Sequence, residues 1–327
     1  MSSIGRRAAA VVFVMCVGCT LIAPEKRFFD SRGLEAIASV DGSVDALALA
    51  GDDLYVVSGT ALLRKSVADT EPLQPVAHAT VGFDHLVSDG ASLVAWCDAG
   101  AWTYDPVNGA RKIPDSAKCA SIAAWHGTVA YVEANGSNRV RVFDARAGAI
   151  VGSAIALPIS EPGPLGLAIS APGEIYATSP VGVMRVCQAA DLGCENGLCR
   201  LSSANPQTSH VAVVGSGASA RVLWFDGVQG VMSAPTSACC PFADKNCDAD
   251  PLRQRRSAPV ADAVVGDRIF VLGEGSVRVV DAFADPTRDV VISAADANAR
   301  VLAMNGDRIV FTSGSQIVRA GYRVVTP

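Results

Sequence analysis

Three six-residue stretches decide the fold of this 327-residue chain: GDDLYV at 51–56, GDRIFV at 266–271 and GDRIVF at 306–311. An apolar segment precedes each stretch, and a turn with a second glycine follows it. A glycine-containing turn between two apolar runs is typical of a β-hairpin. Because the last two copies begin 40 residues apart, the chain repeats one small β unit at a nearly fixed period.

A second recurring segment ends in aspartate: RVFD at 141–144, RVVD at 278–281 and, as a looser copy, WTYD at 102–105. In two of these three segments a glycine follows the aspartate by four residues, at Gly109 and Gly148. In such turns aspartate accepts hydrogen bonds from the backbone ahead of it, and glycine adopts a positive φ. These segments therefore predict strands that end in tight turns.

Aligned on both segments, the chain divides into seven units, spaced by 36 to 50 residues, that begin near Val44, Phe83, Cys119, Pro164, His210, Val260 and Asn298. Each unit contains three clear strands of five to seven residues and, except in the last unit, a weaker fourth; they are named A to D here in chain order. No stretch sustains a 3.6-residue apolar period, so helix should be minor. We expect an all-β fold, a seven-bladed β-propeller, rather than a two-sheet sandwich.

The repeats resemble those of the YVTN, NHL and PQQ-like propellers over nearly all of residues 34–327. This resemblance implies a fold and no particular chemistry. None of the binding residues of those families can be placed on this chain one by one.

A ring of blades has to close, and the last unit contains only three strands and a short tail. Residues 34–40 form a spare strand of suitable composition before the first unit. We predict that this strand pairs with the last blade, because the pairing removes exposed strand edges. The alternative is that residues 323–325 supply the missing strand.

The first nineteen residues are typical of an export signal, with Arg6 and Arg7 ahead of an apolar run at 8–17 that is too short to span a bilayer. The small residues before Cys19 resemble the lipobox of bacterial lipoproteins, although Cys16 stands where that family usually has leucine. The resemblance implies acylation of Cys19, which would become the mature N-terminus. The alternative is ordinary cleavage, for instance after Ala23, which would give a secreted, non-lipidated propeller.

This organisation predicts a signal peptide at 1–19, a tether at 20–33 and the propeller at 34–327. Thr20 follows Cys19, whereas in lipoproteins an aspartate there commonly marks retention at the inner membrane. We therefore expect a lipid anchor at the outer membrane or cell surface. Without lipidation, the protein would be periplasmic or secreted.

Once Cys16 and Cys19 are set aside, eight of the ten cysteines remain, an even number that is typical of disulfides in an oxidising compartment. Cys97 ends strand B of the second unit, and Cys119 begins strand A of the third. Both residues should lie towards one face of the ring in adjacent blades. We therefore expect them to form a bridge.

The other six cysteines fall in enlarged connections between strands C and D of the fourth and fifth units. Six residues separate the cysteines of each local pair, Cys187–Cys194 and Cys240–Cys247, so each pair is expected to close its own loop. Cys199 and Cys239 could then bridge the neighbouring blades. Six cysteines allow 15 pairings, so this pattern is a preference among alternatives.

A metal site is the competing interpretation of these loops. Only Cys194 and Cys199 have the short spacing of structural zinc ligands. Asp244, Asp248 and Asp250 suggest calcium, but their spacing does not match a full calcium loop. We therefore predict no metal and no cofactor.

The chain lacks the common catalytic motifs, including Gly-x-Ser-x-Gly, His-Glu-x-x-His and a phosphate loop. His85 and His210 lie near the starts of A strands and could face a central pocket, although an isolated histidine there is more often packed or solvated. We expect the four tryptophans to pack in the core or between blades, with a sugar-stacking platform as the alternative: Trp96, Trp102, Trp125 and Trp224.

A formal charge of −5 gives the chain no electrostatic footprint for nucleic acid. Its one basic cluster, Arg253, Arg255 and Arg256, is expected in a solvated loop. The leading hypothesis is a non-enzymatic envelope lipoprotein that serves as a binding or assembly platform for protein or polysaccharide. Its distinctive surface would be the cysteine-rich loops, unless these only add stability.

The second hypothesis is a hydrolase or lactonase with a metal site at the central channel. Such an enzyme needs carboxylates, asparagines or histidines from several A strands to converge. The A strands consist mostly of alanine, valine, leucine and serine, which argues against this hypothesis.

Overall fold

The computed structural model describes residues 28–29, 32–134, 138–158, 165–170, 173–187, 194, 196–203, 211–215, 217–226, 230–240, 250–251, 261–265, 268–273, 276–281, 289–294, 299–305, 308–321 and 324–325. The predicted signal peptide, the proposed lipid site Cys19, and the residues Cys247, His210, Arg253, Arg255 and Arg256 lie outside these ranges. Within them the secondary structure is β apart from one 3₁₀ turn, η1 (Gly217–Ser219). No helix in this part of the chain is long and apolar enough to cross a bilayer.

The described strands form seven antiparallel four-stranded sheets, here called blades 1 to 7. Blade 1 holds β3 (Ala46–Ala50), β4 (Asp53–Ser58), β5 (Ala61–Ser66) and β6 (Gln74–His78), and blade 2 holds β7 (Asp84–Ser88), β8 (Val94–Asp98), β9 (Gly100–Asp105) and β10 (Gly109–Lys112). Blade 3 holds β11 (Cys119–Trp125), β12 (Thr128–Ala134), β13 (Asn138–Asp144) and β14 (Ala149–Ala156).

Blade 4 holds β15 (Gly166–Ile169), β16 (Ile175–Ser179), β17 (Gly182–Val186) and β18 (Leu198–Ser202), and blade 5 holds β19 (Val211–Val214), β20 (Arg221–Asp226), β21 (Gly230–Pro235) and β22 (Asp250–Pro251). Blade 6 holds β23 (Ala261–Val265), β24 (Arg268–Gly273), β25 (Ser276–Asp281) and β26 (Asp289–Ala294). Blade 7 combines β27 (Leu302–Asn305), β28 (Arg308–Ser313) and β29 (Gln316–Gly321) with the N-terminal strand β2 (Arg32–Ser39).

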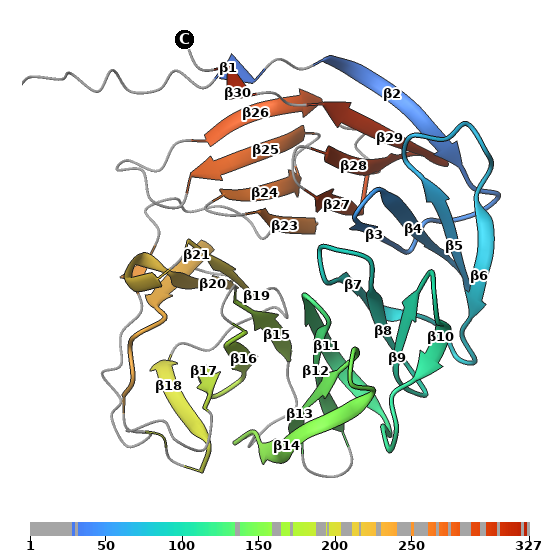
Figure 1. Cartoon of the computed structure of the whole chain (residues 1–327). Coiled ribbons are helices and arrows are strands. Elements are labelled where there is room, and N and C mark those ends of the chain that lie inside the picture. The colour runs from blue at the N-terminus through green and yellow to red at the C-terminus, as the bar shows by residue number, and fades with distance from the viewer. Residues whose placement is uncertain are drawn as a thin grey trace, which may run out of the picture.

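The blades are arranged around a central axis, and the first strand of each blade lies innermost (Figure 1). Each innermost strand contacts that of the next blade, from β3 through β7, β11, β15, β19 and β23 to β27, and β27 contacts β3 again. The sheets therefore form a closed ring, a β-propeller.

The predicted closing strand is confirmed, because β2 pairs antiparallel with β29 as the outermost strand of blade 7. The backbone N–H of Val40 extends this pairing by donating to the carbonyl of Ser315 at 3.2 Å. The alternative closing segment is wrong: β30 (Val324–Val325) pairs with β1 (Phe28–Phe29) in a separate two-stranded sheet. β1 lies within the segment that the sequence assigned to the tether.

The aspartate turns have the predicted geometry. Asp105 accepts the backbone N–H groups of Val107 and Asn108 at 2.9 and 2.8 Å. Asp144 likewise accepts two backbone N–H groups ahead of it, and Gly109 and Gly148 have φ of 70° and 66°. Local hydrogen bonding thus ends strand C in both blades before the chain reverses.

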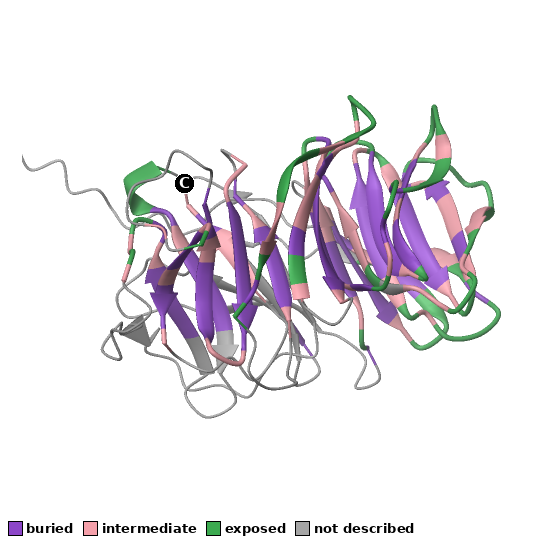
Figure 2. Cartoon of the chain, turned by 90° about the horizontal axis from the view of Figure 1, so that it is seen from below, coloured by how far each residue is buried: buried purple, intermediate pink, exposed green. Residues whose placement is uncertain are grey.

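Among the described residues the core lies between blades, where strand faces pack against one another, and exposed residues gather in loops and outer edges (Figure 2). Trp96 of blade 2 is 1% exposed and packs with Tyr55 of blade 1 in one cluster. Trp224 of blade 5 is fully buried in a cluster with Tyr176 of blade 4. Burying one such aromatic side chain contributes about 4–6 kcal/mol, since each removes about 150–250 Å² from water.

Candidate functional site

The antiparallel order gives the ring two distinct faces. A–B turns and C–D connections lie on one face, called the A–B face, and B–C turns and D–A connections lie on the other, called the B–C face. In blade 4, for example, Val186 at the end of strand C pairs with Ile175 at the start of strand B. The connection that follows Val186 therefore begins on the A–B face.

The blade 4 connection starts with a local disulfide between Cys187 and Cys194, as the sequence predicted. The backbone N–H of Cys187 also donates to the carbonyl of Gly197 at 2.8 Å. The covalent link and the hydrogen bond close the base of this loop, so its two ends are fixed relative to strands C and D of the blade.

A second disulfide joins blade 4 to blade 5, between Cys199 and Cys239, and this pairing was also predicted. Cys199 lies inside strand β18, rather than in the C–D connection where the sequence placed it. The reason is that the neighbouring Leu198 and Leu201 are buried, and they draw this segment into the sheet. The backbone N–H of Cys240 donates to the carbonyl of Arg200 at 2.8 Å and reinforces the link.

The blade 4 loop also contacts blade 3. Gly197 has φ of +79°, and a Cβ there would lie 3.2 Å from the Cδ1 atom of Ile155 in β14. Asn196 adopts φ of +54°, a conformation that asparagine tolerates better than most residues. The cysteine-linked loops thus span blades 3, 4 and 5. We call the described part of these loops that is not buried, residues 194, 196, 197, 200 and 237–240, the linked-loop surface.

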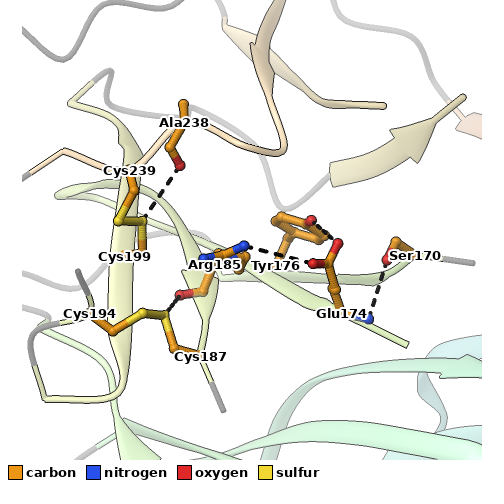
Figure 3. A network of polar contacts seen from close by, with 9 residues as sticks. All are labelled: Ser170, Glu174, Tyr176, Arg185, Cys187, Cys194, Cys199, Ala238 and Cys239. Carbon is orange, nitrogen blue, oxygen red and sulfur yellow. Dashed lines mark hydrogen bonds and ion pairs between the residues drawn. A yellow bond between two sulfur atoms is a disulfide. The ribbon is translucent and has the colours of Figure 1, made fainter. Parts of the chain in front are cut away.

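A polar network lies beside the two disulfides of blade 4 (Figure 3). The Tyr176 hydroxyl donates to Oε2 of Glu174 at 2.7 Å, and Nη1 of Arg185 lies 3.7 Å from Oε1 of the same carboxylate. The backbone N–H of Glu174 donates to Oγ of Ser170 at 3.2 Å. Burial, with the hydrogen bond to Glu174 as the second cause, raises the pKa of Tyr176 above its usual value. Tyr176 therefore stays a protonated donor that positions Glu174.

Blades 1 and 3 contain related groups, which the sequence analysis did not detect. Tyr55 pairs across strands with Arg64, whose Nη2 contacts Asp53 at 2.7 Å. Tyr131 pairs in the same way with Arg141, and Nε of Arg141 contacts Glu133 at 2.7 Å. The shared signal is an acidic residue two positions from a strand B tyrosine, with arginine on strand C. Its recurrence in three blades indicates a structural role.

The central channel has a volume of about 500 Å³. Its described lining comes from six inner strands and the ends of their turns: Leu47, Ala48, Leu49, Val87, Ser88, Asp89, Gly90, Ala123, Ala124, Trp125, Leu167, Ala168, Ile169, Val211, Ala212, Val213, Leu302, Ala303, Met304 and Asn305. Within that set Asp89 is the only titratable side chain. The predicted preponderance of small and aliphatic residues on the A strands is therefore found in the channel.

The carboxylate of Asp89 is already occupied by the protein backbone. Its Oδ1 accepts the N–H groups of Ala91, Ser92 and Leu93 at 2.9, 3.1 and 3.0 Å, and its Oδ2 accepts that of Gly127 at 2.9 Å. A carboxylate with four such donors is a structural clamp rather than a base. One sequence signal that could have identified it is the Asp-Gly pair directly after strand A of blade 2.

The described histidines do not gather at the channel. His85 is exposed in β7, whose contribution to the lining begins at Val87. His78 is exposed on β6, and His126 is exposed beside Trp125, with 4.5 Å between the ring centroids. His85 is thus solvated, the situation that the sequence favoured, and it does not face the central pocket, because the lining comes from later residues of the same strand.

The zinc interpretation is also wrong, since Cys194, Cys199 and Cys239 are bonded to other cysteines and offer no thiolate. No cluster of three or more metal-binding side chains occurs in the part of the chain that the structure covers. The side chains of the proposed calcium ligands Asp244, Asp248 and Asp250 lie outside that part.

A third disulfide lies on the opposite face of the ring. Cys97 in β8 of blade 2 bonds to Cys119 in β11 of blade 3, as predicted from the propeller geometry. Cys240 is disulfide-bonded as well, and its predicted partner Cys247 lies outside the described residues. Disulfides of this number indicate an oxidising compartment, outside the cytoplasm.

No protein-family model and no curated protein matches the sequence. Solved structures with a similar fold include virginiamycin B lyase from Staphylococcus aureus, with a TM-score of 0.62 and 11% identity over 89% of this chain and 99% of that one. The Dos1 propeller gives a TM-score of 0.56 and 10% identity over 90% of this chain and 95% of that one.

PorZ, a bacterial surface component of the type-IX secretion system of Porphyromonas gingivalis, also has a TM-score of 0.56 and 10% identity. The match covers 90% of this chain but only 40% of the length of PorZ. At these identities the likeness establishes the β-propeller fold alone.

Proposed function

We propose that the protein is a lipid-anchored binding platform of the bacterial envelope, which captures a protein partner on the linked-loop surface and catalyses no reaction. The observation that carries this proposal is the cross-linking of that surface. Two disulfides and the contact of Gly197 with Ile155 hold loops from blades 4 and 5 on three adjacent blades. A pre-organised surface loses little conformational entropy when it binds a partner.

A protein partner is favoured over a polysaccharide by the placement of the aromatic side chains. Sugar binding commonly relies on exposed aromatic faces, whereas Trp96 and Trp224 are buried. Trp102 stacks on Trp96 with 6.1 Å between ring centroids, which leaves it packed between strands. Only Trp125 reaches the channel lining.

The absence of catalysis is supported by the channel, the usual place for a propeller active site. Asp89 is the one titratable side chain of the described lining, and backbone donors occupy its carboxylate. The hydroxyl of Ser88 is the only potential nucleophile in the described lining, and no free base lies there to activate it, as a hydrolase or lactonase would need.

The envelope location is supported by the disulfides, and the lipid anchor by the resemblance of residues 17–19 to a lipobox. The surface role of PorZ agrees with an assembly function, although the likeness to it is one of fold. Mass spectrometry of the mature N-terminus tests the anchor: a diacylated or triacylated Cys19 is expected, and an unmodified N-terminus near Pro24 would refute it.

Site-specific photo-crosslinking in intact cells tests the binding surface. A photoreactive residue replaces Ser237, which is exposed on the linked-loop surface. Matched positions are Val107, 91% exposed on the A–B face of blade 2, and Thr60, exposed on the B–C face of blade 1.

We expect one discrete adduct from Ser237 that is absent from Thr60 and weak from Val107. Its protein component is identified by mass spectrometry and then verified by reciprocal pull-down. Equal adducts from all three positions, or a discrete adduct from Thr60 alone, would disprove the surface assignment. An adduct that glycosidases remove would replace the protein partner with a polysaccharide.

A further inference from the structure

We infer that the A–B face is turned towards the membrane when the chain is anchored through Cys19, so that the linked-loop surface meets its partner at the lipid surface. This inference rests on the lipid anchor in the proposed function. It goes further, because it assigns an orientation to the ring and makes the partner a protein of the same membrane.

The chain enters the ring at the A–B end of blade 7. Arg32, the first residue of β2, pairs with Gly321 at the end of β29, and Gly321 also pairs with Arg308 at the start of β28. Since Arg308 follows the A–B turn of blade 7, these three residues mark the A–B face. At the other end of β2, Val40 bonds to Ser315 in the B–C turn.

The β1–β30 pair fixes Phe28, where the tether ends, at the same end of blade 7. β30 follows β29 after only two residues, and its register pairs Phe28 with Val325 and Phe29 with Val324. The pair lies beyond the end of β29 and next to the start of β2 (Figure 1). The tether therefore joins the folded protein at Phe28, on the A–B side of the rim.

Even when fully extended, the tether between Cys19 and Phe28 is only slightly longer than a blade is high. Nine residue steps separate Cys19 from Phe28, so the tether spans at most about 31 Å when fully extended. β2 contains eight residues and is about 26 Å long at about 3.3 Å per residue. With the B–C face on the membrane, the tether would have to run almost fully extended along the height of the blade to reach the bilayer. With the A–B face on the membrane, the tether can remain relaxed.

The same face carries the linked-loop surface, because the connections after β17 and β21 both start there. Thr236 after β21 donates its N–H to the carbonyl of Ala220, which directly precedes β20, at 3.0 Å. Blade 5 therefore repeats the arrangement of Val186 and Ile175 in blade 4. A surface that faces the bilayer is reached most readily by a protein that lies in the bilayer.

Quenching by labelled lipids tests the orientation with the full lipidated chain in vesicles. A fluorophore is coupled to an azide-bearing residue at Val107 or at Val81, with exposed fractions of 91% and 79%. Val107 lies in the C–D turn of blade 2. Val81 lies on the opposite face of the same blade, where its N–H donates to Asp98 at 2.9 Å. The two labelled positions therefore lie on opposite faces of the ring at the same blade.

Protein-bearing vesicles are first isolated by flotation, with Cys19→Ala as the non-lipidated control, and a headgroup-labelled quencher lipid is then added. We expect strong quenching at Val107 and little at Val81, and the same contrast between Ser237 and Ser315 on other blades. Insertion of twelve glycine and serine residues after Ala23 should abolish the contrast, because a long tether no longer fixes the face.

Each result decides one point. If the chain floats but quenching is stronger at Val81 than at Val107, the orientation is wrong and the anchor stands. The same holds if quenching depends on which blade carries the label and not on which face. If the wild-type chain does not float, the anchor and the orientation both fail. A contrast that survives the lengthened tether would show that the tether is not its cause and would overturn the inference.

Discussion

The carboxylate of Asp89 in blade 2 accepts the backbone N–H of Gly127 in blade 3 at 2.9 Å, across 38 residues of sequence. His126 adds its own N–H to the carbonyl of Asp89 at 3.1 Å. On the other side, Nδ2 of Asn305 in blade 7 donates to the carbonyl of Gly51 in blade 1 at 3.0 Å. Polar contacts between A–B turns thus hold neighbouring blades together on one face.

Asp89→Ala should lower the free energy of unfolding by about 3 kcal/mol, because it leaves buried N–H donors without an acceptor at about 1–3 kcal/mol each. Urea denaturation followed by tryptophan fluorescence measures the change. Ser88→Ala is the matched control: its hydroxyl accepts one exposed N–H, from Gly90 at 3.0 Å, and should matter little. Equal effects of the two substitutions would contradict the clamp.

Gly51→Ala should destabilise the ring more than Gly59→Ala. Both glycines have a positive φ, +57° and +59°, so both substitutions incur about 1 kcal/mol of backbone strain. At Gly51 a Cβ would also lie 2.5 Å from the carbonyl oxygen of Ala91 in blade 2, whereas nothing lies within 4 Å at Gly59. We expect a further loss of about 1–3 kcal/mol at Gly51, and equal losses would show that the blades do not press together there.

Loss of the disulfide between blades should cost more than loss of the local one. The chain-entropy relation gives about 4 kcal/mol for the double variant Cys199→Ser/Cys239→Ser and about 2.5 kcal/mol for Cys187→Ser/Cys194→Ser, because the sequence separations are 40 and 7 residues. Thermal unfolding of both variants, with non-reducing peptide mapping to verify the remaining bridges, measures the difference. If the variant without the local disulfide lost more stability, the blade 4 loop would depend on its disulfide more than the junction of blades 4 and 5 does.

The stability contributed by Asp98 should fall in acid. Partial burial acts to raise its pKa, but hydrogen bonds from the backbone N–H groups of Thr80, Val81 and Ala99 outweigh this and hold the pKa below its usual value. A carboxyl with a lowered pKa in the folded state stabilises the fold above its unfolded value of about 3.9 and loses that contribution as the pH falls through the folded pKa. Asp98→Asn should therefore flatten the pH dependence of unfolding below about pH 4, measured by urea titrations from pH 2.5 to 7. An unchanged acid slope would exclude Asp98 as its source.

Deletion of residues 20–39 should yield a chain that self-associates, because β29 would then present a free strand edge. Deletion of residues 20–27 alone keeps β1 and β2 and should leave a monomer-sized particle in size-exclusion chromatography. A synthetic peptide of residues 32–40, added during refolding, should return the longer deletion variant to a monomer-sized particle. A stable monomer without β2 would show that the ring closes by other means.

Much of the β-propeller could be predicted from the sequence because its evidence is local. Asp105 and Asp144 accept N–H groups two and three residues ahead of them, so the turn chemistry is contained in one short segment. The closing strand was predictable for a related reason: a unit with three strands needs a fourth, and only a few segments were spare. The disulfide of Cys97 and Cys119 followed once strand order and direction were assumed.

The sequence by itself therefore determined the repeated β unit, and it favoured the closing strand at the N-terminus and the three disulfide pairings that the structure contains. Tertiary structure alone decided which turns touch across blades, that Cys199 lies inside a strand, and that His85 stays out of the channel lining. The physical reason is the separation along the sequence over which each interaction acts. Turn chemistry and strand alternation act over a few residues, whereas the contacts of Asp89 with Gly127 and of Asn305 with Gly51 span 38 and 254 residues and exist only after the ring has closed.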